Sequence, residues 1–285
     1  MMSKRNFLNA IGLGGVAAAL AGCSVLSTFN ALTPKDGGVR RIARDVKYGD
    51  DPRQGYDVYG PAKPGKPLPL LVFFYGGGWY SGSKNDYVWM GHALAALGYV
   101  VALPDYRVFP QVVYPAFLED NAAAVKHLIA HAADYGADVA RLGLSGQSAG
   151  AYSAVVLALD QQYLGPSDPV KACVGISGPY DFYPFDVKAS KDTFGQWPRP
   201  LETQPISYAR PTKTHFLFLQ SRADKVVGVH NSVNLQAKLL ADGDDCRLKL
   251  YDGLTHEDTA AVYAIPFRGK APLYRDTQAF LAETL

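Results

Sequence analysis

The sequence predicts an α/β fold, built on a mostly parallel, twisted β-sheet with an antiparallel N-terminal edge and helices on both faces. Short, fully apolar runs are typical of strands that are buried on both sides. Between them lie segments with apolar residues three and four positions apart, as in amphipathic helices. Strands that alternate with helices in this way form a parallel sheet covered on both faces.

The predicted elements follow one another without an internal repeat or a linker beyond residue 45, which indicates one domain over residues 45–285. Residues 44–48 and 54–59 form an antiparallel hairpin. The buried strands are predicted at residues 70–75, 99–103, 141–144, 172–176, 215–219 and 247–251. The helices are predicted at residues 88–97, 115–132, 149–159, 231–241 and 273–281.

The longest irregular stretch covers residues 179–211 and is rich in aromatic side chains. Long irregular inserts in compact domains commonly serve a function. We therefore expect a short cap-like insertion over a site.

Composition excludes several classes of protein. Of the 285 residues, 48% are hydrophobic and 19% are charged, which excludes a disordered or collagen-like chain. Three cysteines are too few for a disulfide scaffold, and their spacing does not suggest zinc. Cys173 falls in one predicted strand and Cys246 directly precedes another, and the two strands would lie two strand spacings apart, so we expect buried free thiols.

The N-terminus has the three-part plan of a secretory signal. Lys4 and Arg5 give a basic start, and an uncharged stretch over residues 7–20 follows. This apolar run is shorter than the roughly 20 residues of a membrane-spanning helix, which makes a permanent transmembrane anchor the weaker interpretation. We expect a signal peptide over residues 1–22 and a polar tether over residues 23–44.

The end of this signal, Leu-Ala-Gly-Cys23, resembles a bacterial lipoprotein box, in which the cysteine is lipidated and the chain is cut before it. The resemblance implies a protein anchored by lipid in the cell envelope, and Ser24 favours the periplasmic face of the outer membrane. A plain signal followed by a chance cysteine is the alternative. Loss of the basic start leaves equal numbers of acidic and basic residues, so charge gives no reason to expect nucleic acid as a partner.

A Gly-x-Ser-x-Gly motif covers residues 146–150 and joins a predicted strand to a predicted helix. Its small residues permit a strained turn that lifts the Ser148 hydroxyl above the sheet, beside the positive end of the helix. A phosphate-binding turn is the alternative, but neither G-x-G-x-x-G nor a Walker lysine is present. For Gln147 two interpretations stay open, a contact with the turn or the substrate and simple packing.

Three glycines follow Tyr75, directly after a predicted strand. Glycine leaves backbone N–H groups able to approach a ligand closely. Enzymes that transfer acyl groups need such donors where a carbonyl oxygen becomes an anion. A flexible turn is the alternative interpretation.

A base and an acid are expected after the serine, in the order serine, acid, histidine. His256 follows a predicted strand, whereas His215 opens one and His230 begins a helix. Asp224 is the preferred acid because it ends a core strand between Ser148 and His256. The competing acids are Asp181, Asp252 and Asp258.

The segments YGGGW, GQSAG, SRAD and THED together resemble the α/β-hydrolase superfamily, on its carboxylesterase branch near the hormone-sensitive-lipase-like enzymes. The segment DYRVFPQ beginning at Asp105 looks most like isoprenylcysteine methylesterases and bacterial acetyl xylan or feruloyl-type esterases. The resemblance implies Ser148 as nucleophile, His256 as base and Asp224 as its orienting acid. It also implies an oxyanion hole formed by the N–H groups of Gly77, Gly78 and Ala149.

The resemblance further implies a serine hydrolase of small acyl esters that forms an acyl-enzyme and needs no metal or organic cofactor. A formamidase-type amide hydrolase and a noncatalytic binding protein on a hydrolase fold are the alternatives. One residue departs from the family pattern. Relatives usually have histidine where this chain has Tyr75, which raises the question of what supports the glycine loop.

Overall fold

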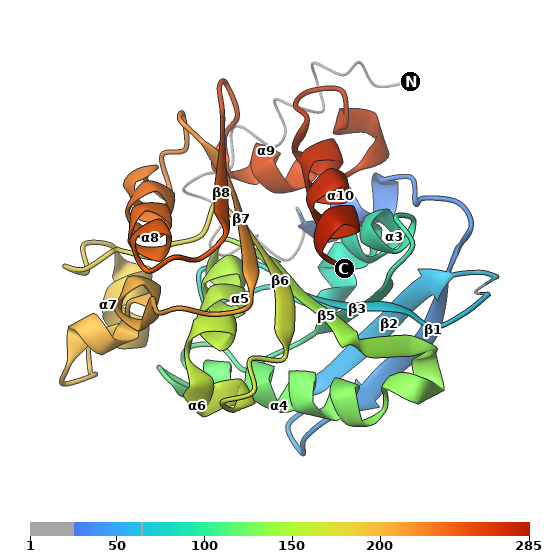
Figure 1. Cartoon of the computed structure of the whole chain (residues 1–285), viewed down its shortest axis with the longest axis horizontal. Coiled ribbons are helices and arrows are strands. Elements are labelled where there is room, and N and C mark those ends of the chain that lie inside the picture. The colour runs from blue at the N-terminus through green and yellow to red at the C-terminus, as the bar shows by residue number, and fades with distance from the viewer. Residues whose placement is uncertain (1–25, 64) are drawn as a thin grey trace.

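An eight-stranded β-sheet runs through the protein, for which a computed structural model describes residues 26–63 and 65–285 (Figure 1). The predicted signal peptide and Cys23 lie outside these residues. The strands are β1 (Val39–Lys47), β2 (Gly55–Pro61), β3 (Leu68–Phe74), β4 (Val100–Pro104), β5 (Ala137–Gln147), β6 (Val170–Ile176), β7 (His215–Ser221) and β8 (Cys246–Tyr251).

The helices cover the sheet and the loops at its edge. The longer ones are α3 (Val88–Ala95), α4 (Ala116–Ala130), α5 (Ala149–Leu159), α8 (His230–Ala241) and α10 (Leu273–Thr284). The shorter ones are η1 (Lys84–Tyr87), η2 (Ala132–Tyr135), α6 (Gln161–Leu164), α7 (Lys188–Phe194), η3 (Pro200–Thr203), η4 (Pro205–Tyr208), α9 (His256–Ala261) and η5 (Ile265–Phe267). All of the predicted strands and helices are confirmed, with shifts at their ends.

The strand order is β1-β2-β4-β3-β5-β6-β7-β8. Strand β2 pairs antiparallel with both β1 and β4, and every later pair is parallel. The expected mostly parallel sheet with an antiparallel N-terminal edge is therefore confirmed. Because parallel strands end at the same edge, the residues that follow β3, β5, β7 and β8 come together there.

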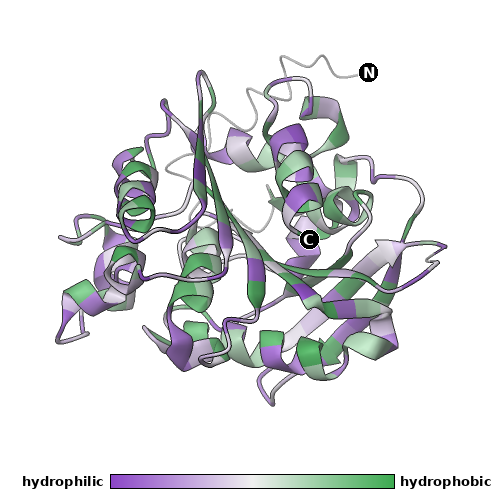
Figure 2. Cartoon of the chain, in the orientation of Figure 1, coloured by the Kyte–Doolittle hydropathy of each residue, from purple (hydrophilic) through white to green (hydrophobic). Residues whose placement is uncertain are grey.

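The core lies on both faces of this sheet. Strands β3, β4 and β6 are almost wholly buried, as their apolar runs predict. Helices α3 and α10 lie on one side of the sheet, and α4, α5 and α8 on the other (Figure 1). Hydrophobic residues follow the central strands, and hydrophilic residues gather on the outer helix surfaces (Figure 2). Helix α5 is buried along its whole length because it packs under the sheet.

The structure corrects the expected tether over residues 23–44. Residues 26–32 form a helix, and β1 already begins at Val39. Phe29 is buried, with its ring centroid 5.3 Å from that of Trp89. Asp36 is tied to Arg268 by a two-pronged ion pair with both distances at 2.7 Å. Packing and charge therefore bind this polar-looking segment to the domain.

The two remaining cysteines agree with the sequence prediction. Cys173 on β6 and Cys246 on β8 are buried and free, and β7 lies between their strands. Burial raises the pKa of both thiols. Within residues 26–63 and 65–285, no helix has the length and apolar character needed to span a membrane.

Candidate active site

Ser148 occupies a strained turn between β5 and α5. Its backbone angles are φ 55° and ψ −125°, a conformation that L-residues rarely adopt outside functional sites. Its N–H donates to the carbonyl of Ile176 at 2.9 Å, and its side chain is half-buried. A Cβ at Gly150 would lie 2.0 Å from the carbonyl oxygen of Phe74, so the turn requires glycine there. The motif thus lifts Ser148 above the carboxyl end of the sheet.

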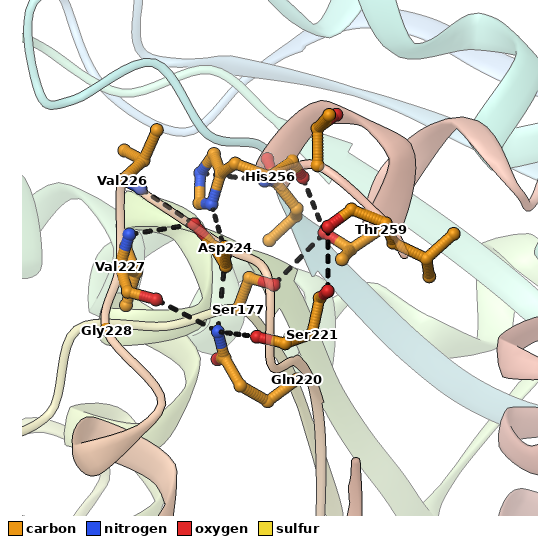
Figure 3. A network of polar contacts seen from close by, with 12 residues as sticks. Ser177, Gln220, Ser221, Asp224, Val226, Val227, Gly228, His256 and Thr259 are labelled. Carbon is orange, nitrogen blue, oxygen red and sulfur yellow. Dashed lines mark hydrogen bonds and ion pairs between the residues drawn. The ribbon is translucent and has the colours of Figure 1, made fainter. Parts of the chain in front are cut away.

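His256 and Asp224 form a buried pair (Figure 3). Oδ2 of Asp224 lies 2.8 Å from Nδ1 of His256. Asp224 follows β7, and His256 is the first residue of α9. The N-cap of α9 is Thr255, whose side chain accepts from the N–H of Asp258 in a capping box. The cap fixes where α9 begins and therefore where the imidazole points.

Backbone donors hold the second oxygen of the Asp224 carboxylate. The N–H groups of Val226 and Val227 both donate to Oδ1 at 2.9 Å. Burial raises the pKa of Asp224, but the hydrogen bond and charge of His256 and these two N–H groups outweigh it, so the pKa lies below its ordinary value. The carboxylate is therefore ionised near neutral pH and accepts the Nδ1 proton of His256.

The three glycines at residues 76–78 form a loop, called the glycine loop below, which lies against the turn at Ser148. A Cβ on Gly76 would come within 3.0 Å of Cβ of Ser148. Gly77 and Gly78 both have positive φ, at 142° and 60°. Among the described residues, the N–H groups of Gly77, Gly78 and Ala149 donate to no protein acceptor. Three unused donors from two segments thus border the same turn.

Tyr75, directly after the strand that leads into the glycines, supports this loop through hydrogen bonds. Its ring is fully buried, and its hydroxyl donates to Oδ1 of Asp105 at 2.8 Å. Arg53 reaches the same hydroxyl at 3.1 Å and the carbonyl of Gly82 at 2.7 Å. The hydroxyl of Tyr106 donates to the carbonyl of Tyr75 at 2.8 Å. Tyrosine therefore supplies the support that its place in the family pattern called into question.

The insertion over residues 179–211 contacts the loop of glycines through α7. Cβ of Ala189 lies 3.9 Å from the position where Gly78 would carry its own Cβ. Tyr80 donates a hydrogen bond to Asp192, and Trp79 packs edge-to-face on Phe194 with ring centroids 4.8 Å apart. The expected irregular stretch thus contains short helices, and an aromatic cluster holds it on the domain.

The structure joins His256 to the serine turn through Gln147. The amide nitrogen of Gln147 lies 3.2 Å from Nε2 of His256. Among the described residues, no hydrogen bond links the Ser148 hydroxyl to His256. Asp224 and His256 are therefore in contact with each other, and His256 reaches the turn at the residue before Ser148.

Comparison with known proteins assigns a family to this chain. The model of the family BD-FAE matches residues 56–239, which is more than half of the chain.

The chain belongs to the BD-FAE family.

Curated relatives of this BD-FAE protein include esterases. The isoprenylcysteine alpha-carbonyl methylesterase of Arabidopsis thaliana is 27% identical over 244 residues, covering 77% of this chain and 57% of that protein. Carboxylesterase NlhH of Mycobacterium tuberculosis is 36% identical over 155 residues, covering 53% of this chain and 47% of that protein. The matched part spans less than two thirds of either relative's own length.

Solved structures share the fold of the BD-FAE protein. Esterase B from Lactobacillus rhamnosis superposes with a TM-score of 0.79 at 20% identity, covering 95% of this chain and 96% of that one. A truncated carbohydrate esterase from gut microbiota superposes with a TM-score of 0.74 at 20% identity, covering 88% of this chain and 99% of that one. The α/β-hydrolase fold expected from the sequence is thereby confirmed.

The competing acids and histidines of the BD-FAE protein lie in other contacts. Asp258 accepts from the N–H of Thr255 at 3.0 Å and pairs with Lys270. The remaining alternatives also bond away from the serine turn: Asp181 to Asn234, Asp252 to Arg222, His215 to Asp245 and His230 to the carbonyl of Asp181.

Several supporting side chains of the site were not found from the sequence. Thr259 donates to the carbonyl of His256 at 2.6 Å and accepts from Ser177 at 3.1 Å, and Gln220 reaches Oδ2 of Asp224 at 3.3 Å (Figure 3). The spacing Thr-x-x-Asp over residues 255–258 is a readable capping signal that could have fixed the start of α9. Nothing in the sequence indicates the bonds from Ser177 and Gln220. Among the described residues, no cluster of His, Cys, Asp and Glu is suited to a metal ion.

Proposed function

We propose that this protein is a serine carboxylic-ester hydrolase that acts on small acyl esters through an acyl-enzyme. The observation that carries the proposal is the contact between Asp224 and His256 at 2.8 Å, beside a strained serine turn and a loop of unused N–H donors. Each part has a defined task in acyl transfer.

In the first half of the reaction, Asp224 holds the proton on Nδ1 of His256, so Nε2 is free to take the proton of Ser148. The serine oxygen then attacks the ester carbonyl. Negative charge develops on the carbonyl oxygen, where the N–H groups of Gly77, Gly78 and Ala149 stabilise it, each by roughly 3 to 4 kcal/mol. His256 passes its proton to the leaving alcohol, and the acyl group remains on Ser148.

In the second half, water takes the place of the alcohol. His256 removes a proton from this water, and the resulting hydroxide attacks the acyl-enzyme. The same N–H groups stabilise the second tetrahedral intermediate. When it collapses, His256 returns the proton to Ser148 and the carboxylic acid leaves.

The proposed preference for esters with small acyl groups is supported by the contact between the insertion and the glycine loop. Ala189 lies close to Gly78, and aromatic rings fill the space behind Trp79. The insertion therefore packs against the segment whose N–H groups would hold the reacting carbonyl. Esterase B from Lactobacillus rhamnosis, which shares the fold, was solved with a C4-C4 tributyrin phosphonate inhibitor.

The deciding experiment is labelling with a fluorophosphonate, located by mass spectrometry, alongside hydrolysis of p-nitrophenyl acetate. Wild type and Ser148→Ala are compared. We expect the label on Ser148 and the loss of both label and turnover in the variant. Folded wild type that neither labels nor turns over would refute the hydrolase assignment. Faster turnover of formanilides than of esters would replace it with an amide hydrolase.

We also propose export and lipid anchoring through Cys23, at the periplasmic face of the outer membrane. The support is the basic, apolar and small-residue plan of residues 1–23. Two or three acyl chains give stable membrane attachment, at about 0.8 kcal/mol per buried methylene. Cys23→Ser is expected to keep its activity and to move from the membrane to the soluble fraction. Unchanged membrane retention would contradict the anchor.

A further inference from the structure

One side chain, that of Gln147, contacts both His256 and the glycine loop. It ends β5, is 5% exposed, and directly precedes Ser148. Its amide nitrogen lies 3.2 Å from Nε2 of His256. Its amide oxygen lies 2.5 Å from the position where Gly76 would carry Cβ, which puts it against the first glycine of the loop.

These contacts are compatible with one tautomer of the imidazole. The ionised Asp224 can only accept, so Nδ1 of His256 carries the proton. Nε2 then has a lone pair, and the Gln147 amide must present its N–H to it. The opposite amide orientation would set an oxygen lone pair against the nitrogen lone pair. The tautomer selected in this way is the one that a general base needs.

We propose that Gln147 is a positioning residue, whose amide holds neutral His256 in the base-competent tautomer next to Ser148 until the serine hydroxyl replaces it on Nε2. The inference rests on the proposed function, in which His256 is the base. At 3.2 Å the bond is at the long end of the normal range, so the hydroxyl can displace it at small cost. Close packing against Gly76 limits the movement of the amide on its other side.

The first test is Gln147→Met, which keeps an unbranched side chain of similar length and removes the amide. We expect kcat for p-nitrophenyl acetate and the rate of fluorophosphonate labelling to fall by about 10- to 100-fold, with KM changed by less than about 2-fold. Gln147→Glu keeps the shape but lacks the N–H donor, so it is not expected to restore the rate. An unchanged or faster rate in Gln147→Met overturns the inference.

The matched control is Gln236→Met on α8. Gln236 is half-buried, and among the described residues its amide donates only to the carbonyl of Cys246 at 3.3 Å. This variant is expected to keep the wild-type rates. A loss equal to that of Gln147→Met would assign the effect to general destabilisation and overturn the positioning role.

The second test is a nitrogen NMR spectrum of protein labelled with ¹⁵N-histidine, in which His256→Ala identifies the signals. We expect wild-type Nε2 to be unprotonated and hydrogen-bonded, and its shift to move in Gln147→Met while Nδ1 stays protonated. A protonated Nε2 in wild type, or an unmoved signal, overturns the inference even if a variant fails to fold. Wild type that does not label refutes the proposed function instead, so the two failures are distinguishable.

Discussion

The two sides of the candidate site are built in opposite ways. On one side, the side chains of Asp224 and His256 carry the proposed chemistry, and backbone N–H groups from Val226 and Val227 hold them. On the other side, the backbone of the glycine loop carries it, and the side chains of Tyr75 and Arg53 hold the loop.

This difference determines how each side tolerates substitution. A reacting side chain is lost outright when it is replaced, whereas a reacting backbone group persists and can only be displaced. The acid–base side should therefore respond to the removal of single functional groups. The loop side should respond to added volume and to the loss of buried support.

The largest effect is expected for His256→Ala, which removes the proposed base. Turnover of p-nitrophenyl acetate should fall by about 10³- to 10⁶-fold, because one member of a catalytic triad contributes on this scale. Circular dichroism and thermal melting check that the fold is kept. Controls are His215→Ala and His230→Ala, which should retain turnover. Near-normal turnover in His256→Ala would point to one of those histidines as the base.

Gly77→Ala and Gly78→Ala test the loop side as a pair. A Cβ at Gly77 would lie 2.1 Å from the carbonyl oxygen of Ser81, so the loop must move, and kcat/KM should fall by about 100- to 1000-fold. In the part of the chain that the structure describes, a Cβ at Gly78 would have one neighbour within 4 Å, Cβ of Ala189 at 3.9 Å. In Gly78→Ala the main effect should be backbone strain, which lowers the free energy of unfolding by about 1–2 kcal/mol, and kcat/KM should fall less than in Gly77→Ala. Equal losses of kcat/KM in the two variants would contradict the view that the position of the loop backbone determines the rate.

Tyr75→Phe removes support without changing the loop itself. Asp105 loses one donor and Arg53 loses one acceptor inside the fold. The free energy of unfolding should fall by about 1–2 kcal/mol. The second-order rate of fluorophosphonate labelling should fall by less than about 10-fold. A kinetic loss as large as that of Gly77→Ala would mean that the phenol takes part in the reaction itself.

The carboxylates of Asp224 and Asp105 should respond to pH with opposite signs. The pKa of Asp224 is lowered, so its stabilising contribution is present above its unfolded pKa, near about 4, and is lost as pH falls through the folded value. Burial raises the pKa of Asp105 against the donors that surround it, so the folded state takes up this proton first and gains stability as pH falls toward about 4.

Urea unfolding from pH 7 to pH 3 checks both signs, with wild type compared with Asp224→Asn and Asp105→Asn. The stability difference between wild type and Asp224→Asn should shrink at the acid end. As pH falls, the free energy of unfolding of wild type should increase relative to that of Asp105→Asn. If both stability differences changed in the same direction with pH, the predicted contrast between Asp224 and Asp105 would be wrong.

The sequence alone determined the fold class, the order of the elements and the residues to examine. Continuous apolar runs were sufficient for β3, β4 and β6, because strands buried on both faces leave no polar side. The motif around Ser148 could be recognised because its turn tolerates only small residues. The order of residues along the chain then reduced the number of candidates for the acid and the base. Polar composition misplaced the segment before residue 45, because a buried ring, ion pairs and the pairing of β1 with β2 bind it to the domain.

Only the tertiary structure decided which groups meet. Asp181, Asp224, Asp252 and Asp258 are equivalent as carboxylates, and the ends of β7 and β8 bring only Asp224 to His256. The support of the glycine loop by Arg53, Tyr75 and Asp105 joins three distant segments of the chain. The contact of Gln147 with His256 depends on the angle at which α9 enters the site. Such contacts depend on directions in space, which residue types and spacings do not encode.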